Sequence, residues 1–265
     1  MRGFEEAVAR VGRLPRDNLN EYGFDPFGFS PDFVARIAPL AHVVYRRYFR
    51  AAAYGIEKVP TGRVILVANH SGQIPIDGMI IACAMMLDAE PPRMVRSMVE
   101  KFVPALPFVS YFMSRTGQVV GTPDNCVRLL ERDETILAFP EGVAGISKTF
   151  SKRYQLQEFG HGFMRLALQT RSPIVPVAVI GGEEQAPSLY NSRAIARLFA
   201  APSFPITPTL LPLPVKYRLY FGEPMRFKGD AEAEDRQIEP KVRSVRSTLQ
   251  ALVHRGLRER RHVFW

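Results

Sequence analysis

The sequence predicts an α/β protein with a mostly parallel central sheet flanked by helices and preceded by an N-terminal helical extension. Short apolar runs typical of buried strands recur along the chain, at residues 63–69, 93–98, 134–139, 173–180 and 215–221. Helical patterns separate several of these runs, at residues 78–88, about 122–132 and 157–171. Because a helix between two strands allows both to run in the same direction, this alternation favours a parallel sheet.

Residues 1–54 are predicted to form the helical extension, and residues 55–265 the α/β domain. Ser30 and Pro31 mark a helix start, since serine caps helices and proline suits the first helical position. Apolar residues then recur at helical spacing, at Phe33, Ile37, Leu40 and Val44. The helix is expected to run to about Arg50, where aromatic and arginine side chains mix. Two interpretations of this end remain open: a core stripe with a solvated basic end, or an anchor at a membrane interface.

Capping residues and periodicity predict two further helices. Thr122 and Pro123 begin a helix that runs to about Arg132. The last helix, about residues 239–260, carries a row of apolar residues on one face, at Val242, Val245, Leu249, Leu252 and Leu257. No internal repeat and no second-domain boundary are visible.

Charge and cysteine content limit the partners that the chain is expected to have. The 265 residues carry a formal net charge of +9, which favours an anionic partner such as a phospholipid surface. Cys83 and Cys126 lack metal-ligand spacing and fit a reducing compartment. The first residues lack the pattern of a secretory signal, and no stretch reaches the ~18 to 20 apolar residues of a spanning helix. We therefore expect peripheral attachment to an anionic membrane, on its cytoplasmic side.

The segment from Val64 to Gly78, VILVANHSGQIPIDG, has the pattern of a catalytic base on an α/β fold. An apolar run leads directly into His70, which lies in a loop rich in glycine and proline, and Asp77 follows a few residues later. A strand fixes the position of such a histidine, the loop leaves its imidazole open, and a carboxylate can fix its tautomer. A histidine after a strand is also common as a hydrogen-bonded structural residue, so this pattern needs a second one beside it.

That second pattern is ILAFPEG, residues 136–142, another apolar run that ends in a polar turn with Glu141. Sites in parallel sheets gather at the carboxyl ends of the strands. If the two strands are parallel, His70 and Glu141 therefore lie at the same edge of the sheet. The loop after Glu141 adds Lys148 and Arg153, whose charge suits a phosphate group, although a solvated basic loop has the same composition.

The two motifs together resemble those of the glycerolipid acyltransferase family, the PlsC-like lysophospholipid acyltransferases. That family carries a His-x4-Asp block and, downstream, a Phe-Pro-Glu-Gly block. The second block is matched completely, by Phe139, Pro140, Glu141 and Gly142. In the first block His70 and Asp77 are separated by six residues instead of four. An apolar strand with Val-Pro, residues 174–177, matches a further family feature.

Other positions depart from the family pattern in ways that concern the acceptor. Gly117 matches the glycine of the middle block, but Pro123 stands where the family has an arginine. Residues 143–144 are Val-Ala where family members often have Thr-Arg. Lys148 and Arg153 are the expected substitutes. The residues expected to bind substrate are thus Gly117, Phe139, Pro140, Glu141, Gly142, Lys148 and Arg153.

The resemblance implies an acyltransferase that moves a fatty acyl group from acyl-CoA or acyl-carrier protein to a lysophospholipid hydroxyl, with no cofactor or metal. His70 would be the general base and Asp77 would hold its tautomer. Loop amides at residues 71–72 are the expected oxyanion donors. Two alternatives stay open: a related acyltransferase with a different lyso-lipid acceptor, or a non-catalytic lipid-binding protein on the same fold.

Sequence patterns of other functional classes are missing. There is no Gly-x-Ser-x-Gly, which disfavours a serine hydrolase. The five histidines form no His-Glu-x-x-His, so a metal is not expected. The basic segment 254–261 has no nucleic-acid motif beside it, and no nucleic acid is expected as a partner.

Overall fold

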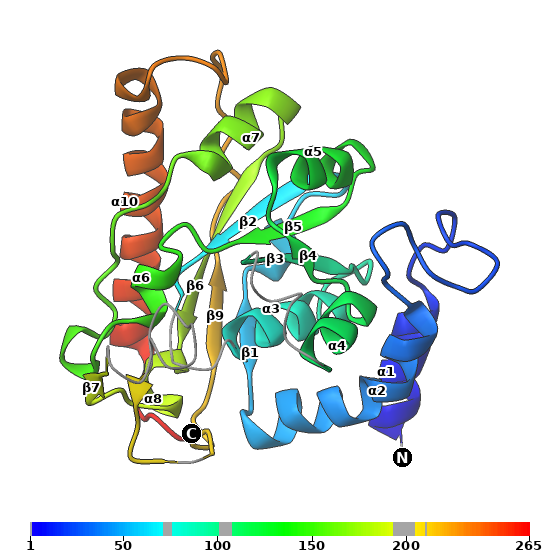
Figure 1. Cartoon of the computed structure of the whole chain (residues 1–265). Helices are drawn as coiled ribbons and strands as arrows, with labels where there is room; N and C mark the ends of the chain where they lie inside the picture. The colour runs from blue at the N-terminus through cyan, green and yellow to red at the C-terminus, as the bar shows by residue number, and fades with distance from the viewer. Residues whose placement is uncertain (1, 71–75, 101–107, 193–204, 210) are drawn as a thin grey trace.

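The computed structural model describes residues 2–70, 76–100, 108–192, 205–209 and 211–265. Its centre is a seven-stranded sheet in the order β1-β9-β6-β2-β5-β3-β4 (Figure 1). The strands are β1 Ala52–Tyr54, β2 Val64–Ala68, β3 Val95–Val99, β4 Val119–Val120, β5 Thr135–Ala138, β6 Ile174–Ile180 and β9 Arg218–Phe221. Every neighbouring pair is parallel except β6 and β9. The predicted α/β class with a mostly parallel sheet is therefore confirmed.

Helices pack on both faces of the sheet. The main ones are α1 Arg2–Gly12, α2 Pro31–Val43, α3 Ile76–Leu87, α4 Val109–Arg115, α5 Pro123–Glu131, α7 Gly162–Thr170 and α10 Asp235–Glu259. Short helices lie between them, at η1 Val44–Tyr48, η2 Ile56–Lys58, α6 Val143–Ile146, η4 Phe150–Lys152 and α8 Gly182–Gln185. A separate two-stranded sheet pairs β7, Tyr190–Asn191, with β8, Pro205–Ile206. Among the helices of the described residues, none is long and apolar enough to cross a membrane.

The continuous apolar runs of the central strands follow from burial on both faces. All five residues of β2 and all seven of β6 are buried. Alternate residues of β2 enter two different cores: Leu66 belongs to the core that contains residues of α1, α2 and α3, and Ile65 to the core that contains residues of α5, α7 and α10. A strand enclosed in this way has no polar side and reads as one apolar run.

The N-terminal cap of α2 is as predicted, but its buried face is not. The hydroxyl oxygen of Ser30 accepts a hydrogen bond from the Phe33 amide at 3.3 Å. The row predicted from Phe33 to Val44 is only partly covered, and Leu40 is 67% exposed. The neighbouring row is the buried one, at Pro31, Val34, Ala38 and Tyr45. A π-helical turn after α2 changes the phase of the helix, so that Tyr45 and Phe49 are buried while Arg46 and Arg47 are exposed.

Two helix starts differ from expectation by four or five residues, and one of these differences bears on the site. Helix α10 begins at Asp235, four residues before the expected start at 239. Helix α7 begins at Gly162, not at 157. The residues before it are not helical, since the Gln157 amide donates to Glu141 at 2.7 Å and the Gly160 amide donates to the Pro140 carbonyl at 3.0 Å. Contacts with the Pro-Glu turn thus replace the first turn of the helix.

Candidate active site

His70 lies at the carboxyl ends of the central parallel strands, where the sequence predicted it. Strand β2 ends at Ala68 and strand β5 at Ala138, and the register pairs Val67 with Ala138. The two segments that follow these strands therefore leave the sheet side by side. Through this pairing, residues that are about 70 positions apart in the chain meet within hydrogen-bonding distance.

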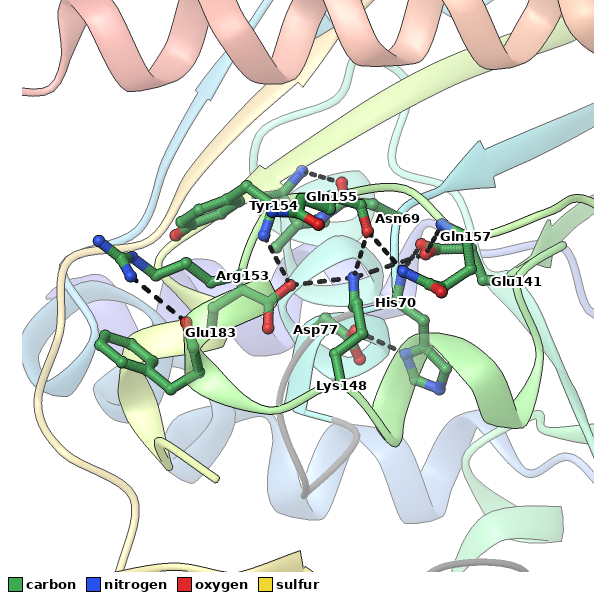
Figure 2. A network of polar contacts seen from close by, with 12 residues as sticks. Asn69, His70, Asp77, Glu141, Lys148, Arg153, Tyr154, Gln155, Gln157 and Glu183 are labelled. Carbon is green, nitrogen blue, oxygen red and sulfur yellow. Dashed lines mark hydrogen bonds and ion pairs between the residues drawn. The ribbon is translucent and has the colours of Figure 1, made fainter. Parts of the chain in front are cut away.

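The imidazole of His70 pairs with the carboxylate of Asp77. The Nδ1 atom of His70 lies 2.7 Å from Oδ2 of Asp77, in the first turn of α3 (Figure 2). A carboxylate accepts only, so the Nδ1–H donates and the lone pair is on Nε2. The Asp77 side chain is 0% exposed, and its Oδ1 accepts the amide of Gly78 at 2.8 Å. The spacing of six residues therefore still brings this pair together. Residues 71–75, with the expected oxyanion donors, lie outside the described part of the chain.

The stacked ring of Phe139 and the close approach of Gly145 restrict the position of His70 on two other sides. The Phe139 ring stacks on the His70 ring, with 4.1 Å between centroids and 18° between planes. A Cβ atom at Gly145 would lie 2.8 Å from the Cβ of His70 and 3.0 Å from the Cβ of Glu141. The absence of a side chain at Gly145 therefore allows α6 to approach His70 closely.

Glu141 contacts the protein backbone on the inner side of the site. The side chain is buried, its Oε1 accepts the His70 amide at 3.1 Å, and its Oε2 accepts the Gln157 amide at 2.7 Å. The turn around it is closed by the Gly142 amide, which donates to the Phe139 carbonyl at 2.9 Å. Gly142 has φ 52° and ψ −142°, a conformation that essentially only glycine adopts. The Phe-Pro-Glu-Gly motif thus holds the His70 backbone in place.

Lys148 and Arg153 do not form the open basic loop that the sequence suggested. The ammonium of Lys148 is buried, 3.4 Å from Oε2 of Glu141 and 3.1 Å from Oε1 of Glu183. Arg153 is exposed, and its guanidinium lies over the Phe150 ring. The guanidinium also donates a hydrogen bond to the backbone carbonyl of Phe150 at 3.3 Å. Figure 2 shows this guanidinium at the far end of the network from the His70 imidazole. The loop therefore divides its two charges between the interior and the surface.

Gly117 and the His70 pair lie at different places in the sheet. Gly117 precedes β4, at the edge of the sheet, three strands away from β2 in the strand order. Its φ of 88° and the Met94 side chain, 2.6 Å from where a Cβ would lie, account for glycine at this turn. The structure thus gives Gly117 a local structural reason and does not bring it to the residues around His70.

Sequence reasoning missed three residues that support the site. Asn69 joins the ends of β2 and β6, because its Nδ2 donates to the Val179 carbonyl at 3.1 Å and its Oδ1 accepts the Val179 amide at 2.8 Å. Gln157 and Glu183 contact Glu141 and Lys148, as described above. For Asn69 the signal was a polar residue at the end of a buried strand. Glu183 is the second residue of α8 and lies 42 positions beyond Glu141 in the chain.

Opposing influences set the pKa of His70. Burial disfavours the charged imidazolium and lowers the pKa, while the charge and hydrogen bond of Asp77 raise it. Glu141 raises it further and Lys148 lowers it, and the net result is a pKa above the ordinary value. Burial also raises the pKa of Glu183, against the opposing effect of Lys148. In the described residues no group of three or more metal-ligating side chains is present.

Comparison with known proteins identifies the class of this chain. A sequence model of the family described as Acyltransferase matches residues 50–180. An uncharacterized protein of Mycobacterium leprae is 38% identical over 97% of this chain and 74% of its own length, and one of Mycobacterium tuberculosis is 36% identical over 98% and 77%. The chain belongs to the acyltransferase family and is an acyltransferase.

Two better described proteins are more distantly similar. The human "DGAT1/2-independent enzyme synthesizing storage lipids" is 26% identical over 77% of this chain and 61% of its own length. The crystal structure of the 1-acyl-sn-glycerophosphate acyltransferase PlsC from Thermotoga maritima has the same fold, with a TM-score of 0.56 and 19% identity. That match covers 87% of this chain and 84% of the other.

Proposed function

We propose that the protein transfers a fatty acyl group from a thioester, acyl-CoA or acyl-carrier protein, to the hydroxyl of a lyso-lipid, with His70 as the general base. The observation that carries the proposal is the 2.7 Å contact between His70 Nδ1 and the buried Asp77 carboxylate. This contact fixes the tautomer whose Nε2 can take a proton. The His70 side chain is 13% exposed, so the imidazole is partly accessible at the edge of the sheet.

The chemistry needs one base and no covalent enzyme intermediate. Nε2 takes the hydroxyl proton as the acceptor oxygen attacks the thioester carbonyl. The tetrahedral intermediate then expels the thiolate, which takes the proton from the imidazolium and leaves as the free thiol. Asp77 stabilises the imidazolium between the two steps. General-base help of this kind contributes about 10²- to 10⁴-fold in rate.

The acceptor is the less defined substrate. The lysophosphatidic acid acceptor named for the PlsC structure supports a phosphate-bearing lyso-lipid. The inward position of Lys148 removes one of the two cations expected to hold that phosphate, and the name of the human relative supports a neutral glycerolipid. Arg153 stays a proposed contact for the headgroup. We propose a lysophospholipid as first acceptor and a neutral acylglycerol as the alternative.

An acceptor panel tests this function. Purified protein is incubated with labelled acyl-CoA or acyl-carrier protein and with lysophosphatidic acid, other lysophospholipids, monoacylglycerol or diacylglycerol. We expect free thiol and acylated lipid to form in equal amounts with at least one acceptor, because transfer releases one thiol per ester. If lyso-lipid bound but thiol was released from neither donor, the result would instead support the non-catalytic alternative.

We also propose peripheral attachment to an anionic membrane, on its cytoplasmic side. Large apolar side chains are exposed on α1, α2 and α4, namely Phe4, Val8, Leu40, Val109, Tyr111 and Phe112. Figure 1 shows these three helices on the same side of the molecule. With a net charge of +9, the protein combines an apolar surface with attraction to acidic headgroups.

Sedimentation with vesicles checks this attachment. We expect binding to vesicles of anionic phospholipid and much weaker binding to vesicles of phosphatidylcholine, since each Lys or Arg near an anionic surface contributes about 1 kcal/mol. Raising the salt concentration should release much of the bound protein, because salt screens these charges. A Leu40→Ser variant should bind less at every salt concentration. Equal binding to both vesicle types would contradict the electrostatic part of the proposal.

A further inference from the structure

The ammonium of Lys148 lies inside the protein between two carboxylates. It is 3.4 Å from Glu141 Oε2 and 3.1 Å from Glu183 Oε1, and the three side chains are 2%, 0% and 5% exposed. In Figure 2 the ammonium lies at the centre of the drawn network, between these two groups. Removing three charged groups from water is costly, and mutual attraction offsets the cost only while the partners stay in place.

Glu141 connects this ammonium to the base of the reaction. Its Oε1 accepts the His70 amide at 3.1 Å, and its Oε2 accepts both the Gln157 amide, at 2.7 Å, and the Lys148 ammonium. The backbone of His70 is thus held by a carboxylate whose charge Lys148 balances. Without Lys148, the buried carboxylates of Glu141 and Glu183 would share one region with no cation between them, which favours protonation or displacement of one of them.

We propose that Lys148 is a positioning residue, which keeps the Glu141 side chain in place and thereby holds the main chain of His70 so that its ring meets Asp77 and Phe139. This proposal rests on the proposed function of His70 as general base. It replaces the phosphate contact expected for Lys148 from the sequence with a role inside the site. It also fits the position of α6, which packs Gly145 against His70 and ends two residues before Lys148.

The charged groups around His70 give this role a measurable signature. Asp77 contacts the imidazole from α3, and the other charged groups that shift its pKa are Glu141, in the turn after β5, and Lys148, in the segment after α6. Lys148 lowers the pKa of His70 and the two carboxylates raise it. Loss of the Lys148 charge by itself raises the pKa of His70, whereas displacement of the His70 ring from Asp77 lowers it, because Asp77 raises this pKa more than Lys148 lowers it. A positioning role therefore predicts a lower pKa without Lys148, and a lysine that acts through its charge alone predicts a higher one.

The test compares Glu183→Gln with the double variant Lys148→Met/Glu183→Gln. The formal charge of the three buried groups is −1 in the wild type, and the double variant also leaves −1, because it removes one positive and one negative charge. It is therefore more tolerable than Lys148→Met alone, which would leave two buried carboxylates. A second double variant, Lys148→Gln/Glu183→Gln, keeps a hydrogen-bond donor near Glu141 and serves if the first does not fold.

The pKa of His70 is measured by NMR on protein labelled at histidine, with the His70→Ala spectrum to assign the signal. Relative to Glu183→Gln, we expect both double variants to have a lower His70 pKa, because the ring moves away from Asp77, and kcat to fall about 10-fold or more with the acceptor KM nearly unchanged. An unchanged or higher pKa would overturn the proposal. A large rise in acceptor KM alone would do so too, in favour of a phosphate contact. Because the NMR measurement needs no turnover, a failure of the positioning role stays distinct from a failure of the acyltransferase mechanism.

Discussion

Replacing His70 with alanine is expected to lower kcat by about 10²- to 10⁴-fold, because the variant has no group to take the acceptor proton. At 1.36 kcal/mol per decade this corresponds to about 3 to 5 kcal/mol of transition-state stabilisation. The acceptor KM should change little, since His70 contributes to proton transfer and the headgroup is held elsewhere. Steady-state kinetics with the best acceptor of the panel, together with the thermal midpoint of each variant, check this expectation.

A matched variant separates chemistry from structure. The Asp77 carboxylate is buried and loses a donor in His70→Ala, so that variant also loses stability. His70→Asn keeps an amide donor for Asp77 but has no basic nitrogen. We expect it to recover much of the thermal midpoint and none of the activity. If His70→Asn restored both, or if a stable His70→Ala kept more than a tenth of wild-type kcat, the general-base mechanism would be wrong.

The pH dependence follows from the same pair. The base must be neutral when the hydroxyl attacks, and the pKa of His70 lies above its ordinary value of 6.5. The acid limb of kcat/KM should therefore lie above pH 6.5 and disappear with His70. The free energy of unfolding changes with pH in the opposite direction to the activity, because a raised pKa means that the folded state binds the proton more tightly than the unfolded state. The contribution of His70 to stability is complete below its unfolded pKa and is lost as the pH rises through the raised folded value.

Much of the site could be predicted from the sequence because it depends on local patterns. The apolar runs predicted strands β2 and β5, and their alternation with helices predicted that the two strands are parallel. Parallel strands have their carboxyl ends on the same side of the sheet, which placed His70 and Glu141 together. Asp77 was found although its spacing departs from the family pattern. Position 77 falls in the first turn of α3, and the structure brings its carboxylate to the His70 ring.

The interior contacts were not predictable, because they join residues with no local signal. Lys148 lies in a polar loop, and such a loop has the same composition whether its lysine points into solvent or toward Glu183. The link between Asn69 and Val179 crosses 110 positions of the chain and depends on β2 and β6 being neighbours. The shifted face of α2 depends on a π-helical turn, which adds a residue to one turn and has no clear sequence signature.

Asp77→Asn is expected to lower kcat by about 10²- to 10⁴-fold without loss of the fold, because the amide reverses the tautomer of the base. In the wild type, Oδ1 accepts the Gly78 amide at 2.8 Å and Oδ2 faces His70 Nδ1 at 2.7 Å. An asparagine keeps its oxygen toward the Gly78 amide, which requires an acceptor. Its NH₂ group then donates to Nδ1, the ring proton moves to Nε2, and Nε2 can no longer take a proton from the acceptor.

Kinetics, a pH profile and the thermal midpoint of Asp77→Asn check this expectation. The acid limb of the remaining activity should move to lower pH, since the carboxylate that raises the pKa of His70 is gone. Glu141 is not expected to take over, because its carboxylate contacts the His70 amide and not the ring. Near-normal kcat with an unchanged acid limb would show that the Asp77 contact does not orient the base. A normal thermal midpoint with lost activity would instead locate the effect of Asp77 in the tautomer of His70.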